Sequence, residues 1–333
     1  MDNWLLNHLV CPRDKSSLEL REGNLRCSND HTYPVVNGCP IMLVDEAEST
    51  HGYIEATKKK VTEILEGGEQ PEFGKLAAEN GGVDDFVQKE IVYTSGNLYS
   101  PVEGNVTRYP IPEFRPPESD GGRLLDIGCN WGRWSVAAGR KGYRPVGLDP
   151  SLDAVMAAGR ISKQLGIEAN FVVGDARFLP FSEDAFDVVF SYGVFQHFSK
   201  ENTLKSLEQI SRVLKEGHKT FVQMPNRFGV RQYYQHWKRG FTEGEGFEIR
   251  YWTPTELLDT FRSKFGETEI SSDCYFGLGI QKSDVDLLPL KYKAVVYSSE
   301  ILKTVSTFIP PLVNMADSVY LVSVNQKKAL SRT

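Results

Sequence analysis

Short apolar runs alternate with helical segments between Arg123 and Pro225, and this alternation restricts the possible fold more than any other feature. The runs read RLLDIG, RPVGLDP, ANFVVGDA, FDVVFSYG and KTFVQMP. The segments between them have helical character, and Ser151 stands where one of them needs an N-cap. Parallel strands read as continuous apolar runs because helices cover both faces of their sheet. The pattern therefore predicts an α/β fold with a doubly wound, parallel sheet.

Composition divides the chain into three regions. Residues 1–46 are compact, with turn signals at CPRD, CSNDH and VNGCP. Residues 47–120 hold one weak helical pattern, ended by Gly67-Gly68, and most of a proline- and glycine-rich linker at 109–122. Residues 121–333 hold the alternating pattern and a last apolar strand, VYLVSVNQ. We expect a small N-terminal module, a connecting segment that caps the ligand site, and an α/β domain.

The bulk composition is ordinary for a soluble globular protein, with 40% hydrophobic residues, 25% charged residues and a formal net charge of -6. No apolar run approaches the roughly eighteen residues of a transmembrane helix. The N-terminus lacks the basic and apolar regions of a signal peptide, which favours the cytoplasm. The five cysteines are sparse and odd in number, which argues against a disulfide framework and fits a reducing compartment.

Polar residues stand where the predicted strands end. Asp126, Asp149, Asp175 and Ser191 follow four successive apolar runs. Aspartate after a strand is ordinary turn chemistry when it stands alone. In a doubly wound sheet, however, ligands bind beyond the carboxyl ends of the strands. Polar residues at the carboxyl ends of four successive strands therefore predict a binding site at that edge of the sheet.

The turn after the first run has the pattern D-x-G-x-N-x-G rather than the G-x-G-x-x-G of dinucleotide sites. Asp149 follows Asp126 by 23 residues and is placed to accept hydrogen bonds from ribose hydroxyls. Asp126 adds negative charge where a pyrophosphate would sit, so it favours a cationic cofactor without phosphate. Asn130 replaces the middle glycine, and asparagine adopts positive φ more readily than most residues.

These motifs together resemble class I S-adenosylmethionine-dependent methyltransferases of the small-molecule type. The resemblance is carried by LLDIGCNWGRWS, GLDPS, VVGDARFLPFSEDAFDVVFSYGVFQHF and ISRVLKEGHKTFVQMPN, and it covers about Leu124 to Asn226 and the last strand. It implies a Rossmann-like methyltransferase sheet and S-adenosylmethionine as the cofactor. The resemblance further implies that Asp126 contacts the ammonium of the cofactor, directly or through water. The loop under its methionine part would consist of Gly128, Cys129, Asn130 and Gly132.

The same resemblance assigns the remaining cofactor contacts. Asp149, with Pro150 beside it, would bind the ribose hydroxyls. Asp175 would accept from the adenine amino group, and Ala176 would donate a backbone N–H. Ser191 and Tyr192 would close the floor near the methyl group. Trp131 either shields the cofactor or packs in the core, and packing is the more common role for such a tryptophan.

Methyl transfer to a hydroxyl needs a base, because the hydroxyl proton leaves as the new bond forms. His197 follows the fourth run, where substrate usually approaches, and an imidazole suits this role. Tyr192 and His236 are the other catalytic candidates. The alternative for His197 is a histidine that caps or packs the segment. Tyr93, Asn97 and Tyr99 are candidates for a cap over the cofactor, against ordinary packing.

Two segments outside these motifs have interaction potential. The stretch 217–242 contains no acidic residue, and on a helical wheel its apolar side is separate from its basic side. We expect an amphipathic surface helix or a wall of an anionic acceptor site, with the basic patch Lys219–Arg239 as an RNA-docking alternative. The C-terminal insert at 287–318 has an apolar helical stripe at Val295, Leu302, Val305 and Ile309. It packs on the sheet, forms a homodimer contact, or rests on a membrane surface, and the first two are favoured.

The N-terminal module resembles a zinc ribbon with some ligands replaced. Cys11 and Asp14 have C-x-x-C spacing, and Cys27 is followed by Asp30 and His31. Zinc accepts cysteine, histidine and carboxylate ligands, so Cys11, Asp14, Cys27 and His31 (or Asp30) form a candidate set. The run YPVVNGCPIML resembles the small activator subunits of tRNA and release-factor methyltransferases, and the Cys–Cys–His spacing resembles the ribbon of an rRNA guanine methyltransferase. The alternative is a metal-free ribbon.

Three functions follow from these features. The leading hypothesis is a methyltransferase that acts at oxygen on a small-molecule, glycan-type or lipid-linked acceptor. The acidic net charge favours this over an RNA methyltransferase that docks through the ribbon and the basic patch. A catalytically inactive binding or activator protein is the third alternative, against which the complete set of aspartates argues.

Overall fold

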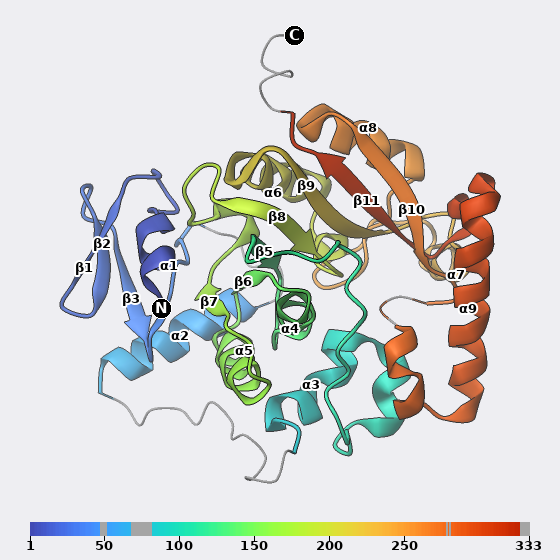
Figure 1. Cartoon of the computed structure of the whole chain (residues 1–333), viewed down its shortest axis with the longest axis horizontal. Coiled ribbons are helices and arrows are strands. Elements are labelled where there is room, and N and C mark those ends of the chain that lie inside the picture. The colour runs from blue at the N-terminus through green and yellow to red at the C-terminus, as the bar shows by residue number, and fades with distance from the viewer. Residues whose placement is uncertain (47–51, 68–81, 278, 280, 327–333) are drawn as a thin grey trace.

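A seven-stranded sheet forms the centre of the molecule in the computed structural model, with strand order β10-β11-β9-β8-β5-β6-β7 (Figure 1). The structure describes residues 1–46, 52–67, 82–277, 279 and 281–326. Five strands are parallel, namely β5 (Arg123–Ile127), β6 (Arg144–Asp149), β7 (Asn170–Val173), β8 (Phe186–Ser191) and β9 (Leu214–Pro225). β10 (Thr268–Cys274) and β11 (Ser318–Val324) complete the sheet, and β11 runs antiparallel to both of its neighbours. The predicted doubly wound sheet is confirmed.

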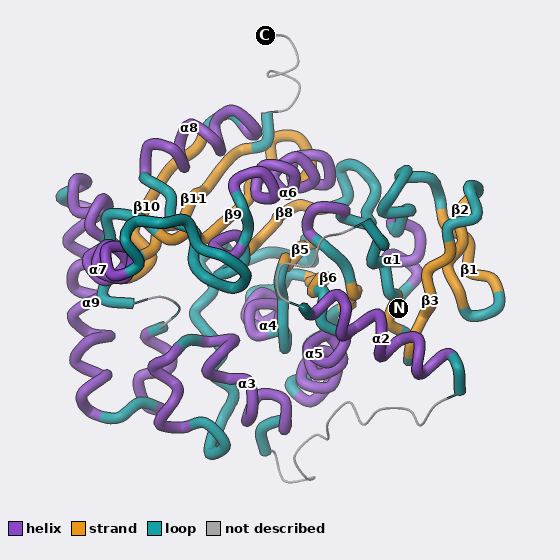
Figure 2. Tube along the Cα trace, turned by 180° about the vertical axis from the view of Figure 1, so that it is seen from behind, coloured by secondary structure: helices purple, strands orange, loops and turns teal. Residues whose placement is uncertain are grey.

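Helices cover both faces of this sheet (Figure 2). α4 (Arg133–Arg140) and α5 (Leu152–Gln164) pack on one face together with α3 (Asp85–Ser95). α6 (Lys200–Val213) and α8 (Pro254–Phe265) pack on the other, where Leu207, Ile210, Leu257 and Phe261 join the core. Ser151 caps α5 as expected, since its side chain accepts from the Ala154 N–H. The connections reverse direction between β5 and β8, which creates the switch point where such sheets bind ligands.

The N-terminal module consists of α1 (Asn3–His8) and a four-stranded antiparallel sheet. Its strands are β1 (Leu18–Arg21), β2 (Asn24–Cys27), β3 (Thr32–Val36) and β4 (Cys39–Pro40). The module docks on the outer edge of β7, because the Met42 N–H donates to the Val173 carbonyl at 2.7 Å and Ile41 bridges Val173 in parallel. Leu5, Leu25 and Tyr33 belong to the same buried cluster as Phe181 and Phe186. The expected β module is therefore present, with a core continuous with that of the large sheet.

Two helical segments connect the module to β5. α2 (Tyr53–Leu65) matches the weak helical pattern and stops before Gly67. α3 is followed by the 3₁₀ segment η1 (Asn97–Val102). Of the expected connecting region 47–120, residues 47–51 and 68–81 lie outside the described residues, and so do 278, 280 and 327–333 of the α/β region. The three expected domain boundaries stay a prediction.

The C-terminal part adds elements at the β10 edge of the sheet. They are α7 (Val230–Lys238), the long helix α9 (Leu290–Phe308), and the 3₁₀ segments η4 (Lys282–Leu287) and η5 (Pro310–Met315). Two further 3₁₀ segments, η2 (Ala176–Phe178) and η3 (Phe195–His197), lie in the central region. The expected helical insert is thus present. Among the described residues, no helix is both long enough and apolar enough to cross a bilayer.

α7 is a surface helix, as one of the two expectations has it, and both its aromatic and its basic residues are mostly exposed. The aromatic side, with Tyr233, Tyr234 and Trp237, is exposed, whereas Gln232 and His236 are buried. The reason is the anchoring of the helix start, where the Arg231 and Gln232 N–H groups both donate to Asp317 Oδ1. This fixes the side of the helix with Gln232 and His236 against the body of the protein.

Candidate active site

A cavity of about 230 Å³ opens at the switch point, beyond the carboxyl ends of β5, β6 and β8. Its walls include most of the residues expected to bind the cofactor. These are Gly128, Cys129, Asn130, Asp149, Pro150, Asp175 and Ala176. Asp126, Gly132 and Ser191 belong to the same strand ends but do not line the cavity. The carboxyl ends of the strands therefore form one site, as the sequence pattern predicts.

The glycine loop between β5 and α4 depends on residues that tolerate positive φ. Gly128 has φ +71°, and a Cβ added there would lie 2.2 Å from Val194 Cγ2. Asn130 has φ 46°, which confirms that asparagine keeps the turn at the middle position. Its side-chain oxygen accepts from the Trp131 N–H at 2.7 Å, a local bond that stabilises this conformation. The loop backbone therefore comes close to any ligand in the cavity.

Asp149 is the central carboxylate of the site. It ends β6, and its oxygens accept from the Asn130 N–H at 3.0 Å and the Ser151 N–H at 2.9 Å. Burial raises the pKa of Asp149 to about 6, although these backbone bonds favour the ionised form. Each carboxylate oxygen still has a free lone pair for a hydroxyl group. The geometry thus fits the expected contact to a ribose diol.

Asp126 lies behind the loop rather than on its surface. It is fully buried, and the Ser135 hydroxyl donates to its Oδ2 at 2.7 Å. Burial raises the pKa of Asp126 to about 7, and the nearby charge of Asp149 acts in the same direction. Ser191 is equally enclosed, with its hydroxyl donating to the Ile127 carbonyl. Neither side chain reaches the cavity directly in this structure.

Asp175 lines the cavity with its carboxylate already bound by Arg177. The Arg177 Nη2 lies 2.6 Å from Asp175 Oδ2, and both side chains are buried. The Arg177 backbone N–H also donates to Asp175 Oδ1 at 2.8 Å. This pairing fixes the carboxylate beside the Ala176 N–H, and a buried ion pair of this kind holds a defined orientation.

Neutral amides line the far end of the cavity, at β8 and β9. The buried Gln223 accepts from the Gly193 N–H through Oε1 at 2.9 Å, while its Nε2 has no partner among the described residues. Gln196 has a buried Oε1 that likewise lacks a partner in the described part of the chain. Unpartnered buried polar atoms are costly, and they are common where a ligand binds. Sequence reasoning missed both glutamines, although a glutamine inside the apolar run KTFVQMP was an available signal.

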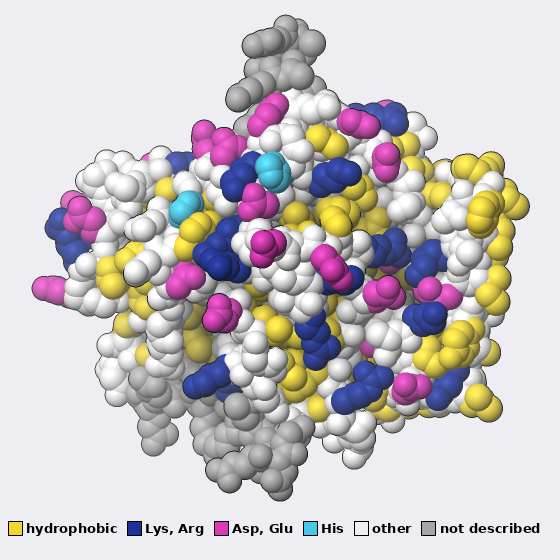
Figure 3. All heavy atoms as spheres, viewed as in Figure 1, with side chains coloured by type: hydrophobic (Ala, Val, Ile, Leu, Met, Phe, Trp, Pro, Cys, Tyr) yellow, Lys and Arg dark blue, Asp and Glu magenta, His cyan; other side chains and the backbone are white. Residues whose placement is uncertain are grey.

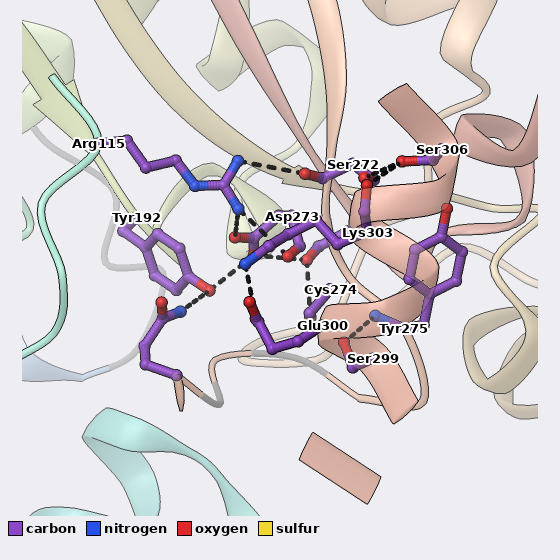
Figure 4. Close-up of polar contacts among 12 residues, drawn as sticks. Arg115, Tyr192, Ser272, Asp273, Cys274, Tyr275, Ser299, Glu300, Lys303 and Ser306 are labelled. Carbon is purple, nitrogen blue, oxygen red and sulfur yellow. Dashed lines mark hydrogen bonds and ion pairs between the residues drawn. The ribbon is translucent and has the colours of Figure 1, made fainter. Parts of the chain in front are cut away.

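Tyr192 points its hydroxyl toward a polar group on β10 (Figure 4). The hydroxyl donates to Asp273 Oδ2 at 2.7 Å and accepts from Gln281 Nε2 at 3.0 Å. Arg115 completes the group by its ion pair with Asp273 Oδ1 at 3.0 Å. Burial and the Asp273 charge raise the pKa of Tyr192 well above its usual value. Tyr192 therefore offers the cavity a neutral aromatic ring.

The two histidine candidates lie in different places. His197 lines the cavity and stacks on Phe247 with a ring separation of 3.9 Å. Its Nδ1 lies 2.7 Å from the Phe247 carbonyl, so this nitrogen carries the proton, and its Nε2 lies 3.0 Å from Gln196 Nε2. His236 is buried on α7 against Phe241 and Tyr251 and is not part of the cavity wall.

The connecting segment supplies the outer wall. Tyr53 and Ile54 from α2, and Tyr93, Thr94 and Ser95 from α3, line the cavity. Among the three cap candidates, Tyr93 lines the cavity, whereas Asn97 and Tyr99 do not.

Tyr99 has a structural position instead. It is fully buried, and its hydroxyl donates to Asp284, which also pairs with Arg133 Nη2. This ties η1 and η4 to the start of α4. Trp131 is also buried, and its Nε1 donates to Thr94 Oγ1 at 3.1 Å, in agreement with a packing role at the cavity wall.

A second polar cluster lies in the N-terminal module. The ligand atoms of Cys11, Asp14, Cys27 and His31 all lie within 4.8 Å of one another. His31 Nδ1 lies 3.4 Å from each cysteine Sγ and 3.3 Å from Asp14 Oδ2, and Cys27 Sγ lies 3.9 Å from Asp14 Oδ2. Tetrahedral zinc with usual bond lengths places such atoms roughly 3.4–3.7 Å apart. The four residues therefore fit a zinc ion.

Neighbouring groups orient this cluster. The Asn29 amide donates to Asp14 Oδ2 at 2.7 Å, and the Ser16 hydroxyl donates to Asp14 Oδ1 at 2.6 Å. Tyr33 Oη lies 3.2 Å from Cys11 Sγ. Such outer hydrogen bonds are usual around metal ligands. Asp30, the alternative to His31, instead pairs with Arg26 at 2.9 Å.

Comparison with known proteins identifies the domain that contains the cavity. Residues 124–217 match the family model described as a methyltransferase domain. The chain is 32% identical over 95 residues to the uncharacterized methyltransferase YcgJ of Bacillus subtilis, covering 28% of this chain and 37% of that protein. The crystal structure of YcgJ has a TM-score of 0.43 at 17% identity, covering 63% of this chain and 94% of that chain.

The names of two further relatives refer to different processes. A probable human tRNA methyltransferase 9B is 29% identical over 113 residues, which are 34% of this chain and 23% of that protein. A ubiquinone biosynthesis O-methyltransferase of Brucella anthropi is 31% identical over 112 residues, which are 34% of this chain and 44% of that protein. The chain thus spans less than half the length of these relatives. Residues 124–217 therefore match a methyltransferase domain, in agreement with the resemblance of their motifs to class I S-adenosylmethionine-dependent methyltransferases.

Proposed function

We propose that the protein transfers a methyl group from S-adenosylmethionine to a hydroxyl of a small-molecule or glycan-type acceptor. The observation that carries this proposal is the single cavity that joins the glycine loop and Asp149 to the neutral amides of Gln196 and Gln223. One end has the groups that a nucleoside needs, and the other end has unpartnered polar atoms for an acceptor. Both ends belong to the methyltransferase domain or directly follow it.

When bound, S-adenosylmethionine supplies a methyl group that is already activated by its sulfonium. Asp149 binds the ribose hydroxyls, and the loop backbone at Gly128 and Asn130 lies under the methionine part. Asp126 acts from behind the loop, through its charge or through water. Asp175, fixed by Arg177, accepts from the adenine amino group. The protein thereby contributes alignment of the methyl group with the acceptor.

A hydroxyl acceptor matches the orphan amides, because a hydroxyl both donates and accepts. Gln223 Nε2 donates to the hydroxyl oxygen, and Gln196 Oε1 accepts from a second polar hydrogen of the acceptor. His197 takes the proton as the oxygen–carbon bond forms and the carbon–sulfur bond breaks. The Phe247 carbonyl accepts the Nδ1 proton, so the lone pair of His197 is on Nε2, where it accepts from Gln196 Nε2 until the acceptor hydroxyl takes the place of that amide. Tyr192 and Phe247 give the acceptor aromatic walls.

The cofactor assignment is tested by calorimetry on Asp149→Ala. We expect S-adenosylmethionine affinity to fall about 100-fold, since charge-assisted hydrogen bonds are lost. Asp153→Ala is the matched control, because Asp153 lies in the first turn of α5 outside the cavity wall and pairs with Lys60. Equal affinity of Asp149→Ala and the wild type would remove the assignment.

The acceptor class is tested with methyl-labelled cofactor and fractionated cell extract. Label in the small polar or lipid-linked fraction supports the proposal, and label in RNA contradicts it. The basic stretch 219–239 gives RNA little support, because its cations are separated. Lys219 and Pro225 are six residues apart on β9, roughly 20 Å, while Arg231 and Lys238 lie on α7 beyond the strand end.

We also propose that Cys11, Asp14, Cys27 and His31 bind a structural zinc ion. The converging atoms at 3.3–3.9 Å support this, together with the hydrogen bonds that orient Asp14. All four positions come from one module, so the ion would connect the turn after α1 to the hairpin of β2 and β3. Metal analysis of protein purified without chelator tests the proposal, and sub-stoichiometric zinc would overturn it.

A further inference from the structure

Helix α9 packs Val296 and part of Leu302 on the sheet, but it exposes four large apolar side chains while it buries two serines, which is unusual for a surface helix. Leu290 and Phe308 are 83% and 82% exposed, and Tyr297 and Ile301 are more than half exposed. Ser299 and Ser306, by contrast, are buried. The expected stripe at Val295, Leu302, Val305 and Ile309 covers only part of the contact with the sheet, and Ile309 is exposed.

Hydrogen bonds from the sheet edge fix this orientation (Figure 4). The Ser306 and Ser272 hydroxyls lie 2.7 Å apart, and the Tyr275 N–H donates to Ser299 Oγ at 2.9 Å. Rotating α9 to bury its apolar side would break these bonds. The exposed ridge is therefore a built feature of the fold.

The exposed residues form a narrow ridge along the whole helix. Leu290, Tyr297, Ile301 and Phe308 are spaced by seven, four and seven residues. At about 100° per residue, all four fall within roughly 40° of one another, and the ridge is about 27 Å long. Figure 3 shows hydrophobic side chains along the edge of the molecule that α9 occupies. A ridge of this shape can lie flat on an extended apolar surface.

Helix α7 adds aromatic and basic side chains at the same edge (Figures 1 and 2). Tyr233, Tyr234 and Trp237 are all about half exposed. Arg231 and Lys238 are exposed between them, and Lys238 Nζ lies 4.8 Å from the centre of the Tyr234 ring. Tyrosine and tryptophan beside lysine and arginine is the composition of a membrane–water interface.

The charge of this edge selects its partner. Residues 226–250 and 288–316 together carry eight basic and four acidic side chains, a net charge of +4 in a chain of net charge -6. A second copy of the chain would bring two such positive surfaces together. An anionic surface is attracted instead, at about 1 kcal/mol per basic residue near the headgroups.

We propose that α7 and α9 dock the protein on an anionic lipid bilayer, with the α9 ridge inserted among the upper acyl chains. The loop after α7 carries Phe247, which stacks on His197 and lines the cavity. Docking therefore brings the acceptor end of the cavity to the headgroup region. Binding to the bilayer does not depend on methyl transfer, so this proposal stands or falls separately from the proposed activity.

Vesicle flotation of the full chain tests the proposal. The probes are vesicles of phosphatidylcholine alone and of phosphatidylcholine with phosphatidylglycerol. The variant L290S/I301S/F308S removes the ridge without touching the core. Its matched control is L20S/L65S/L204S, which replaces three exposed leucines on β1, α2 and α6. We expect binding to anionic vesicles, at least 10-fold weaker binding of the ridge variant, and wild-type binding of the control.

Three results would overturn the proposal. The first is equal binding to neutral and anionic vesicles, and the second is equal loss in the ridge and control variants. The third is no vesicle binding together with a dimer in sedimentation equilibrium that the ridge variant dissociates, which would assign the surface to a second copy. Circular dichroism of each variant establishes that its fold is retained.

Discussion

The polar cluster of the N-terminal module and the cavity of the methyltransferase domain use carboxylates in opposite ways. In the module, the ligand atoms of Asp14, His31 and two cysteines all lie within 4.8 Å of one another. In the cavity, Asp149 and Asp175 are each held by their own neighbours and face an open space. Groups that converge on one point suit an ion, whereas groups that surround a space suit a molecule. Loss of a residue should therefore unfold the first site and only weaken binding at the second.

The largest effect is expected for Cys27→Ser. It removes one of four converging ligands, so zinc is lost and the unfolding free energy falls by about 4 kcal/mol or more. Zinc content and thermal denaturation measure the two effects. Cys39→Ser is the control, because Cys39 is buried in the same module outside the cluster. If the Cys27→Ser protein kept stoichiometric zinc, the expectation that the N-terminal site depends on each of its four ligands would be wrong.

The buried carboxylate of Asp126, behind the glycine loop, should lower the free energy of unfolding when no cofactor is bound. Burial raises the pKa of Asp126 to about 7, while the unfolded chain releases this proton near pH 4. The folded state thus binds more protons, and its stability falls as the pH rises from about 4 to 7. Asp126→Asn removes the Asp126 part of this slope and raises the stability at pH 8 by on the order of 3 kcal/mol. The part due to Asp149, whose pKa is raised to about 6, remains.

Denaturant titrations of wild type and Asp126→Asn from pH 5 to pH 8 measure this difference. Asp187→Asn serves as the control, because the pKa of that carboxylate is lowered rather than raised. If the unfolding free energy of the wild type increased over this pH range, the burial of Asp126 would not be destabilising.

Gly128→Ala should affect the cavity through the backbone. The new Cβ would lie 2.2 Å from Val194 at a φ of +71°, so the loop must move. We expect a loss of about 2 kcal/mol in stability and a loss of cofactor affinity. Gly159→Ala on α5 meets nothing within 4 Å and is expected to be neutral or stabilising. Partial recovery by the added change Val194→Ala would confirm the clash as the cause.

The smallest effect concerns the pH dependence of cofactor binding. Burial raises the pKa of Asp149 to about 6, and the ionised form accepts ribose hydroxyls better. Affinity for S-adenosylmethionine should therefore rise about 10-fold between pH 5 and pH 7.5 and then level. Calorimetry measures it, and a flat profile, equal to that of Asp149→Asn, would contradict this role of the carboxylate.

The sequence predicts the parallel part of the sheet and its site well, because one principle governs both. Buried parallel strands are continuous apolar runs, and their ends converge, so Asp149 and Asp175 could be assigned together. The set at Cys11, Asp14, Cys27 and His31 was also predictable from spacing alone. β10 and α8 were missed, although Thr253, Pro254 and Glu256 form the capping box of α8 and were readable.

The orientations of α7, Asp126 and Tyr192 depend on tertiary contacts that no local sequence pattern contains. The wheel of α7 cannot show that Asp317, 86 residues beyond Arg231, fixes the side with Gln232 and His236 inward and leaves the aromatic side exposed. Similarly, the distance of Asp126 from the cavity follows from its bond to Ser135, one turn into α4. The hydroxyl of Tyr192 points toward Asp273, a residue of the missed strand β10.

The docking of the N-terminal module on β7 has a consequence for biosynthesis. The Met42 N–H pairs with Val173, and the Asp2 N–H pairs with the Asn170 side chain, 168 residues later. The first part of the chain to leave the ribosome must therefore wait until the edge strand of the large sheet has been made. At usual elongation rates of about 5–20 residues per second, this delay lasts roughly ten seconds or more. A metal ion that holds the module together during this interval would protect its unpaired strands from other nascent chains.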